Sequence, residues 1–206
     1  MTPDEIEALF TRGDGYLFAR WGRPIVPVVF GVDDKTLAVV KGAIEAVVTL
    51  AGHRMAETDP ELGSNLMIFF FRDWDELLAL DGLERMVPEL GETVARLKDQ
   101  DANQYRLFRF EKSGEIKAGF VFLRMDDALS AMAAEDLALA QAVQVILLWG
   151  EAAFAERSPL AKLPEGQVIL RPEIAGVIAA GYDPLLPGME RDGAAHALRL
   201  FARMSR

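Results

Sequence analysis

Two stretches of apolar residues in the first half of the chain predict β-strands. Residues 23–32 are apolar and rich in valine, and Pro24 and Pro27 confine this strand to the edge of a sheet because neither can donate a main-chain hydrogen bond. Residues 65–72 are apolar without alternation, which is typical of a strand covered on both faces. We therefore expect one edge strand and one buried strand.

Apolar residues at helical spacing predict two long helices. The first begins at Asp33 or Asp34, either of which can cap it, and continues to about Leu50, where Gly52 provides a stop. The second covers residues 135–154 and is expected to be the longest and most apolar helix of the chain.

A β-hairpin is expected between the two long helices. Residues 105–111 and 115–125 flank a Ser113-Gly114 turn, and the alternation of Arg106, Phe108 and Phe110 is typical of a strand.

Shorter helices are expected at both ends of the chain and in its middle. Thr2 and Glu5 form a capping box for a first helix, which should end near residues 13–15. Residues 73–100 are acidic and weakly helical, and residues 172–181 and 192–204 form a helical C-terminal tail. The sequence thus predicts a single α+β domain over residues 1–206, with a mixed sheet packed on two long helices.

Composition and charge exclude several classes of ligand and of catalytic chemistry. The formal net charge is −10, which argues against unaided binding to nucleic acid or to an anionic membrane surface. There is no cysteine, so disulfides, thiolate nucleophiles and cysteine-ligated zinc are excluded. The first 20 residues lack the basic start and apolar core of a secretory signal, and we expect a cytoplasmic, bacterial protein without cofactors.

Candidate catalytic residues are few. The two histidines, His53 and His196, have no second histidine one helical turn away, and no serine lies in a G-x-S-x-G turn; Ser64, which follows Gly63, is the nearest approach. Carboxylates are more plentiful and could act in acid–base pairs or bind a divalent cation. Each cluster directly precedes a predicted helix, so we expect helix caps: Asp33/Asp34, Asp73/Asp75/Glu76 and Asp126/Asp127.

Several short stretches resemble a known family. They are Arg20-Trp21 before a strand, the 65–71 strand after a long helix, a hairpin leading into a helix that ends at Gly150, and the segment from Tyr182 to Met189. Across residues 18 to 192 the chain resembles an uncharacterised bacterial family of zincin-like domains, which have a metalloprotease fold.

The resemblance implies a zinc-binding motif that this chain lacks. In active zincins the long helix carries H-E-x-x-H, with two histidine ligands and a glutamate base. Anchoring the pattern on Gly150 places Val143 and Leu147 at the histidine positions, Gln144 at the glutamate and Ala153 at a third ligand. A remnant cleft between helix and edge strand would then contain Val143, Gln144, Leu147, Gly150 and Tyr182.

Three hypotheses for function follow. The first is a pseudoenzyme, a non-catalytic domain that binds a protein or peptide in the remnant cleft, with a homodimer as a further option. The second is a hydrolase that uses Asp73, Asp75, Asp126 and Asp127. The third is a purely structural or assembly protein.

Overall fold

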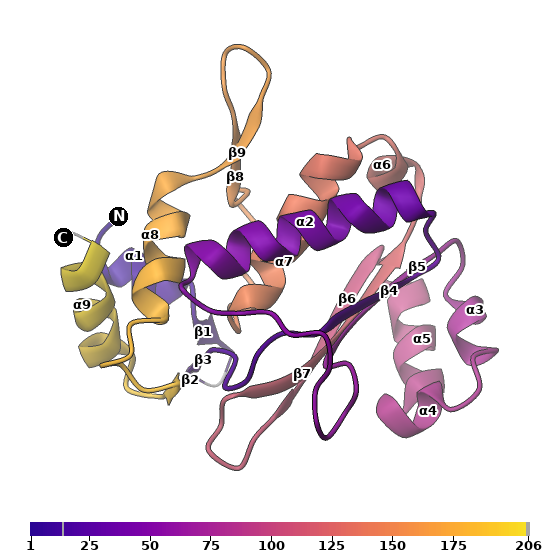
Figure 1. Cartoon of the computed structure of the whole chain (residues 1–206), viewed down its shortest axis with the longest axis horizontal. Helices are drawn as coiled ribbons and strands as arrows, with labels where there is room; N and C mark the ends of the chain where they lie inside the picture. The colour runs from indigo at the N-terminus through magenta and orange to yellow at the C-terminus, as the bar shows by residue number, and fades with distance from the viewer. Residues whose placement is uncertain (14, 205–206) are drawn as a thin grey trace.

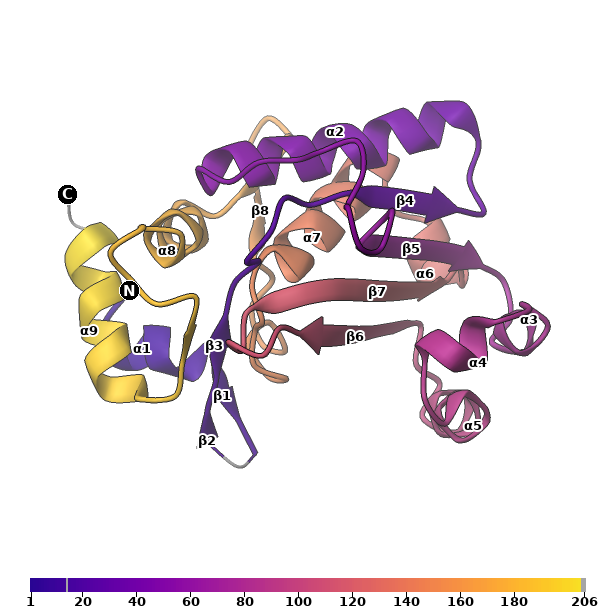
Figure 2. The ribbon, with the colours of Figure 1, turned by 60° about the horizontal axis from the view of Figure 1, so that its bottom comes forward.

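The computed structural model of the chain describes residues 1–13 and 15–204 and has a four-stranded sheet at its centre. The strand order is β4 (Pro27–Phe30), β5 (Leu66–Phe71), β7 (Ile116–Arg124) and β6 (Gln104–Phe110), as Figure 2 shows from top to bottom. The first three strands are parallel and β6 is antiparallel to β7, so the sheet is mixed. The predicted α+β class, the hairpin and the edge position of β4 are confirmed.

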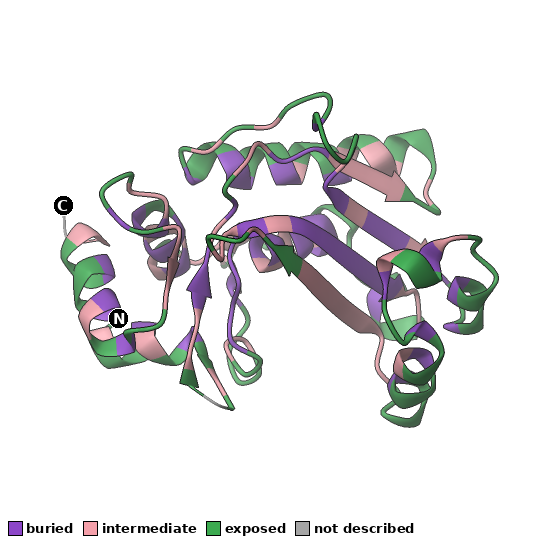
Figure 3. Cartoon of the chain, turned by 90° about the horizontal axis from the view of Figure 1, so that it is seen from below, coloured by how far each residue is buried: buried purple, intermediate pink, exposed green. Residues whose placement is uncertain are grey.

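Helices cover both faces of the sheet (Figure 1). On one face, α2 (Asp34–Leu50) and α7 (Ala134–Ile146) pack on each other and on Ile68 and Val121. On the other face lie α3 (Asp75–Leu78), α4 (Leu83–Met86) and α5 (Leu90–Asp99), whose apolar side chains pack on phenylalanines of β5 and β7. The strands between these layers are mostly buried or half-buried (Figure 3), which confirms that β5 is covered on both faces.

The remaining elements surround this sheet. They are α1 (Pro3–Ala8), β1 (Thr11–Arg12), β2 (Gly15–Tyr16), β3 (Phe18–Ala19), α6 (Asp127–Ser130), β8 (Leu160–Lys162), β9 (Val168–Leu170), α8 (Pro172–Gly181), β10 (Met189–Glu190) and α9 (Gly193–Met204). Helices α1 and α8 pack on α9 at one end of the molecule, and the β8–β9 hairpin projects away from the body of the molecule between α8 and α7 (Figure 1). No helix within the described residues has the length and apolar character needed to span a membrane.

Local capping signals were predicted correctly. Thr2 and Glu5 form both hydrogen bonds of a capping box, and the Asp33 side chain accepts a hydrogen bond from the Thr36 N–H at the start of α2. Gly52 takes a positive φ of 65° directly after α2. These signals act within a few residues of one another, which is why the sequence suffices to identify them.

Two predicted helix ends are wrong. The first helix stops at Ala8, and the chain turns into the β1–β2 hairpin; of the predicted boundary residues 13–15, residue 14 lies outside the described part of the chain. The second long helix covers residues 134–146 instead of 135–154, so α2, with 17 residues, is longer than α7, with 13.

The end of α7 is set by residues far away in the sequence. The Trp21 indole N–H donates to the Val145 carbonyl at 2.8 Å, and the Tyr182 hydroxyl donates to the Ile146 carbonyl at 2.7 Å. Leu147 then leaves the helix to form a bridge with Arg20. Side chains thus satisfy carbonyls that a longer helix would have paired internally.

Gly150 is in contact with the N-terminal hairpin instead of ending the helix. Its N–H donates to the Leu9 carbonyl at 2.7 Å, and a Cβ atom at this position would lie 2.3 Å from the Thr11 carbonyl oxygen. Only glycine permits this approach of two backbones.

Candidate functional site

An open groove of about 930 Å³ runs beside the edge strand β6. Residues from β6 form its floor, the end of α5 forms one wall, and the end of α7 with residues 148–155 forms the other. Both walls carry apolar and polar side chains, including Trp149, Phe154, Gln144 and Gln100. The groove therefore combines an exposed strand with side chains that differ on its two sides.

The outer edge of β6 presents main-chain groups to this groove. The Arg124 N–H donates to the Asn103 carbonyl, and the next residue along, Gln104, lies opposite Leu123. Because hydrogen-bonded residues alternate in an antiparallel pair, the odd-numbered residues of β6 are the ones that bond to β7. By the alternation of an antiparallel pair, the N–H and C=O groups of Gln104, Arg106 and Phe108 point away from β7. No described strand pairs with β6 on that side.

Side chains alternate across the same strand. Arg106 donates hydrogen bonds from Nη2 to the side-chain oxygens of Gln104 and Gln141, the latter a buried residue on α7. Tyr105 points to the opposite face, where the Arg96 guanidinium lies 5.7 Å from its ring centroid. Alternate residues of any added strand would therefore meet different walls.

Three arginines line the groove: Arg12, Arg96 and Arg106. None forms an ion pair with a described carboxylate. Burial lowers the pKa of the Arg106 guanidinium from 12.5 to about 10, because desolvation disfavours the charged form and no anion offsets it. Arg12 is held by one hydrogen bond from Nη2 to the Trp149 carbonyl, at 2.8 Å.

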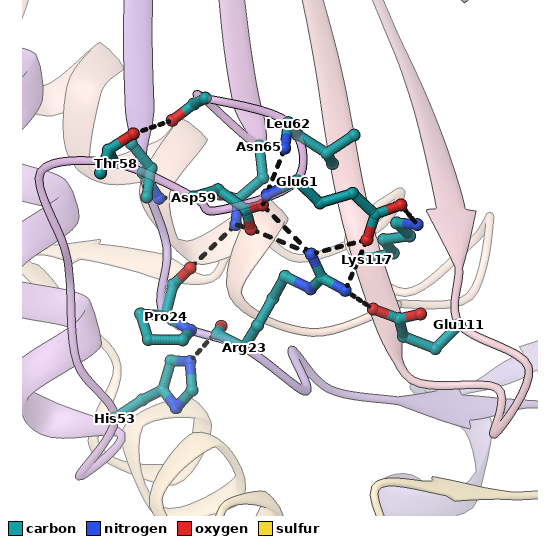
Figure 4. Close-up of polar contacts among 12 residues, drawn as sticks. Arg23, Pro24, His53, Thr58, Asp59, Glu61, Leu62, Asn65, Glu111 and Lys117 are labelled. Carbon is teal, nitrogen blue, oxygen red and sulfur yellow. Dashed lines mark hydrogen bonds and ion pairs between the residues drawn. The ribbon is translucent and has the colours of Figure 1, made fainter.

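A second hollow, of about 880 Å³, lies around Arg23, and unlike the arginines of the groove beside β6, Arg23 is paired with carboxylates of the protein. Figure 4 shows the Arg23 guanidinium between the carboxylates of Asp59, Glu61 and Glu111, with Lys117 bonded to Glu61. All of these charges have partners, so the cluster ties the 59–65 loop to the β6–β7 hairpin. We interpret it as structural.

Asp59 is the buried centre of this second cluster. Burial opposes its ionisation, but main-chain N–H groups of Leu62 and Glu61, together with Arg23 and Asn65, lower its pKa to about 2. A carboxylate held this firmly in its charged form is suited to fixing a loop and poorly suited to exchanging protons near neutral pH.

The two histidines lie in separate, structural surroundings. The His53 Nε2 is 2.9 Å from the Arg23 carbonyl oxygen, and burial lowers its pKa. The His196 Nδ1 is 2.6 Å from the Tyr16 hydroxyl, and burial lowers the pKa of His196 to about 4. Neither forms a hydrogen bond with a serine, Ser64 included, within the part of the chain that the structure describes.

The carboxylate clusters also have structural roles. Asp126 caps α6 through the Leu129 N–H, Asp73 accepts from the Asp75 N–H, and Glu76 accepts from Arg72 and Asp73 N–H groups. Asp75 pairs with Lys98 at 2.7 Å. None of Asp73, Asp75, Asp126 and Asp127 lines the groove, and the described residues contain no cluster of three or more acidic or histidine side chains arranged to hold a metal.

The residues of the expected remnant cleft fall in three places. Gln144 and Gly150 line the groove beside β6. Val143 and Leu147 are fully buried in the core, where α7 packs on the sheet. Tyr182 follows α8 in the sequence, and its hydroxyl reaches the last turn of α7, where it also accepts a hydrogen bond from the Trp21 N–H at 3.3 Å. It does not line the groove.

The arginines of the groove were not identified from the sequence as functional candidates. Arg106 was noted only for its alternation with Phe108, although an arginine on the strand face that a buried helix covers is unusual and could have drawn attention. Arg12 and Arg96 carry no such signal, because only the fold brings them to β6.

Comparison of the chain with protein-family models, with curated proteins and with solved structures finds no match in any of the three.

Proposed function

We propose that this protein is a non-catalytic binding module that takes up an extended peptide segment of a partner protein along the outer edge of β6. The observation that carries the proposal is the coincidence of an unpaired strand edge with a groove of about 930 Å³. An edge strand can bind a peptide through main-chain hydrogen bonds, while pockets on either side select alternate side chains.

The surroundings of the edge support this proposal. Proteins usually shield long edge strands, because an exposed edge invites pairing with other chains. Here β6 has seven residues and stays open within the described chain, and Phe154 and the 43% exposed Phe110 line the groove beside it. Aromatic side chains of this kind supply contact area at low conformational cost.

The groove is lined by a single carboxylate, Glu151, and by no histidine or serine among the described residues, which favours binding over chemistry. If the chain is zincin-like, Gln144, which lines the groove, stands at the position of the catalytic glutamate. Val143 and Leu147 stand at the histidine positions and are buried in the hydrophobic core. A groove that once held an extended substrate would then be kept as a peptide-binding site. The dispersed carboxylates give the alternative hydrolase no shared pocket.

The test is selection of peptides followed by N-methyl scanning. Decapeptides selected from a phage-displayed library would be synthesised with blocked ends, and each amide would be methylated in turn. Strand pairing predicts that methylation at alternate amides abolishes binding, while methylation at the intervening amides is tolerated. Equal tolerance at all amides would contradict the proposal.

A matched pair of variants locates the site. Gln144→Trp places a large side chain in the groove and is expected to weaken binding by at least about 10-fold, whereas Leu185→Trp adds the same side chain to a turn where Leu185 is 81% exposed. The second variant should bind like the unmodified protein. Equal binding by both variants would place the peptide elsewhere.

A further inference from the structure

The groove contains two of the three buried side-chain polar atoms that lack a hydrogen-bond partner within the described chain. These atoms are the Nε of Arg12 and the Nε of Arg106; the third is the His196 Nε2, which lies elsewhere. Buried donors without partners are rare in folded proteins and call for an explanation. Both guanidinium groups line the same groove, so two cationic side chains with incomplete hydrogen bonding meet there.

The charge of the groove is opposite to that of the chain. The formal net charge is −10, yet the groove is lined by Arg12, Arg96 and Arg106, and Glu151 is its one carboxylate among the described residues. Arginines elsewhere show the contrast: Arg23 and Arg203 each pair with carboxylates of the protein itself. Arg106 instead bonds only to the neutral side chains of Gln104 and Gln141.

Each of these two groove-lining guanidinium groups keeps one terminal nitrogen accessible. In Arg12 and Arg106 the hydrogen bonds to protein use Nη2, while Nη1 has no described partner and is not among the buried atoms. Because Nη2 of Arg106 is occupied by the two glutamines and its Nε is buried, a carboxylate is bound by Nη1, through a charge-assisted hydrogen bond that is stronger than one between neutral groups. The glutamine partners hold Arg106 in place and leave its charge unneutralised.

From this geometry we infer that the groove recognises an acidic peptide, with an Asp or Glu side chain of the bound strand paired to Arg106 and a second carboxylate within reach of Arg12. The inference rests on the proposed function and deepens it by naming the class of ligand. A strand added to β6 sends alternate side chains to the face of the sheet on which the Arg106 side chain lies. Acidic residues of the ligand are therefore expected at alternate positions.

The test compares four pools of blocked nonapeptides that are degenerate in Val, Thr and Ser and differ at the central position. That position holds Glu, Gln, phosphoserine or Ser, and a fifth pool has Ser there and a free C-terminal carboxylate. The Glu pool is expected to bind about 10-fold or more tightly than the Gln pool, because the carboxylate adds charge-assisted hydrogen bonds to Arg106. This preference should fall as salt is added.

Protein variants assign the preference to the groove. Arg106→Gln is expected to reduce the Glu preference to within about 2-fold, and Arg12→Gln to weaken it in part, whereas Glu151→Gln should strengthen binding of the Glu pool. Arg191→Gln, which removes an exposed charge outside the groove, is the matched control and should change nothing. The comparison of Glu with Gln in the peptide does not depend on whether any variant folds.

The outcomes separate the two proposals. Equal binding of the Glu and Gln pools, together with sensitivity to alternate N-methylation, would overturn the acidic ligand and leave strand addition intact. Binding of the phosphoserine pool alone, or of the free-terminus pool alone, would also overturn the assignment to a carboxylate side chain. A Glu preference that survives Arg106→Gln in a folded variant would move the recognition away from Arg106.

Discussion

Replacement of His196 by asparagine should remove a large part of the loss of stability in mild acid. His196 is completely buried on α9, between the rings of Phe18 and Tyr16, and its Nδ1 is hydrogen-bonded to the Tyr16 hydroxyl. Burial lowers its pKa from 6.5 to about 4; the nearby Glu190 favours the charged form, while Arg199 and other arginines oppose it. Asparagine can place a polar atom near Nδ1 and does not titrate.

The sign and size of the effect follow from the two pKa values. Because the folded-state pKa lies below the unfolded value, the unfolded chain binds more protons, and stability falls as pH decreases from about 6.5 towards about 4. Between pH 8 and pH 5 the unfolded state gains about 2 kcal/mol from protonation of this one residue. Above pH 7 the contribution to the pH dependence is negligible.

Urea denaturation at pH 8, 7, 6 and 5 measures this effect. The decrease in unfolding free energy between pH 8 and pH 5 should be about 2 kcal/mol larger for the unmodified protein than for His196→Asn. The variant is expected to be less stable at pH 8, since the smaller side chain leaves a cavity, but that loss is the same at every pH. Parallel pH profiles for the two proteins would refute the assignment of His196 as a buried, neutral core residue.

Three further substitutions test the structural roles described above, each by urea denaturation at pH 7. Asp59→Asn should lower the free energy of unfolding by about 2 kcal/mol because it removes the ion pair with Arg23, whereas the control Glu61→Gln, at an exposed partner of the same arginine, should have little effect. The stability that Asp59 contributes should be lost only as the pH falls from about 4 towards 2, since its pKa in the folded state is about 2. Gly150→Ala should lower the free energy of unfolding by about 2 kcal/mol or more, because the added methyl group forces the backbone at residue 150 away from that at Thr11. The control Gly42→Ala, on the open face of α2, should raise it by roughly 1 kcal/mol. Trp21→Phe keeps an aromatic ring but removes the indole N–H that the Val145 carbonyl accepts from, and its smaller ring leaves a cavity, so a cost of about 1–3 kcal/mol is expected. An unchanged midpoint would contradict a structural role for the indole.

The sequence predicts the elements whose signals are local. The caps at Thr2 and Asp33, the apolar β5 and the turn at Ser113-Gly114 depend on residues close together, and each was predicted where the structure has it. The end of α7 could not be predicted in this way, because Trp21 and Tyr182 supply the donors that end the helix. The β8–β9 hairpin was also missed, since its strands have only three residues each.

The candidate site was predicted only in part. The remnant cleft that the resemblance implies includes Gln144 and Gly150, and both line the groove beside β6, although the edge strand predicted from the sequence, residues 23–32, lies at the other edge of the sheet. The significance of Arg106 depends on what surrounds it: a guanidinium next to two glutamines, with no carboxylate partner among the described residues. That environment is assembled from β6 and α7, and no spacing along the chain reveals it.

Amide hydrogen exchange along β6 tests strand addition most directly. In the free protein, the N–H groups of Arg106 and Phe108 should exchange faster than those of Tyr105 and Leu107, which face β7. With a saturating selected peptide that contains glutamate, the account predicts that exchange at Arg106 and Phe108 slows by about 10-fold or more. Exchange at these two amides that stays unchanged while the peptide is bound would contradict it.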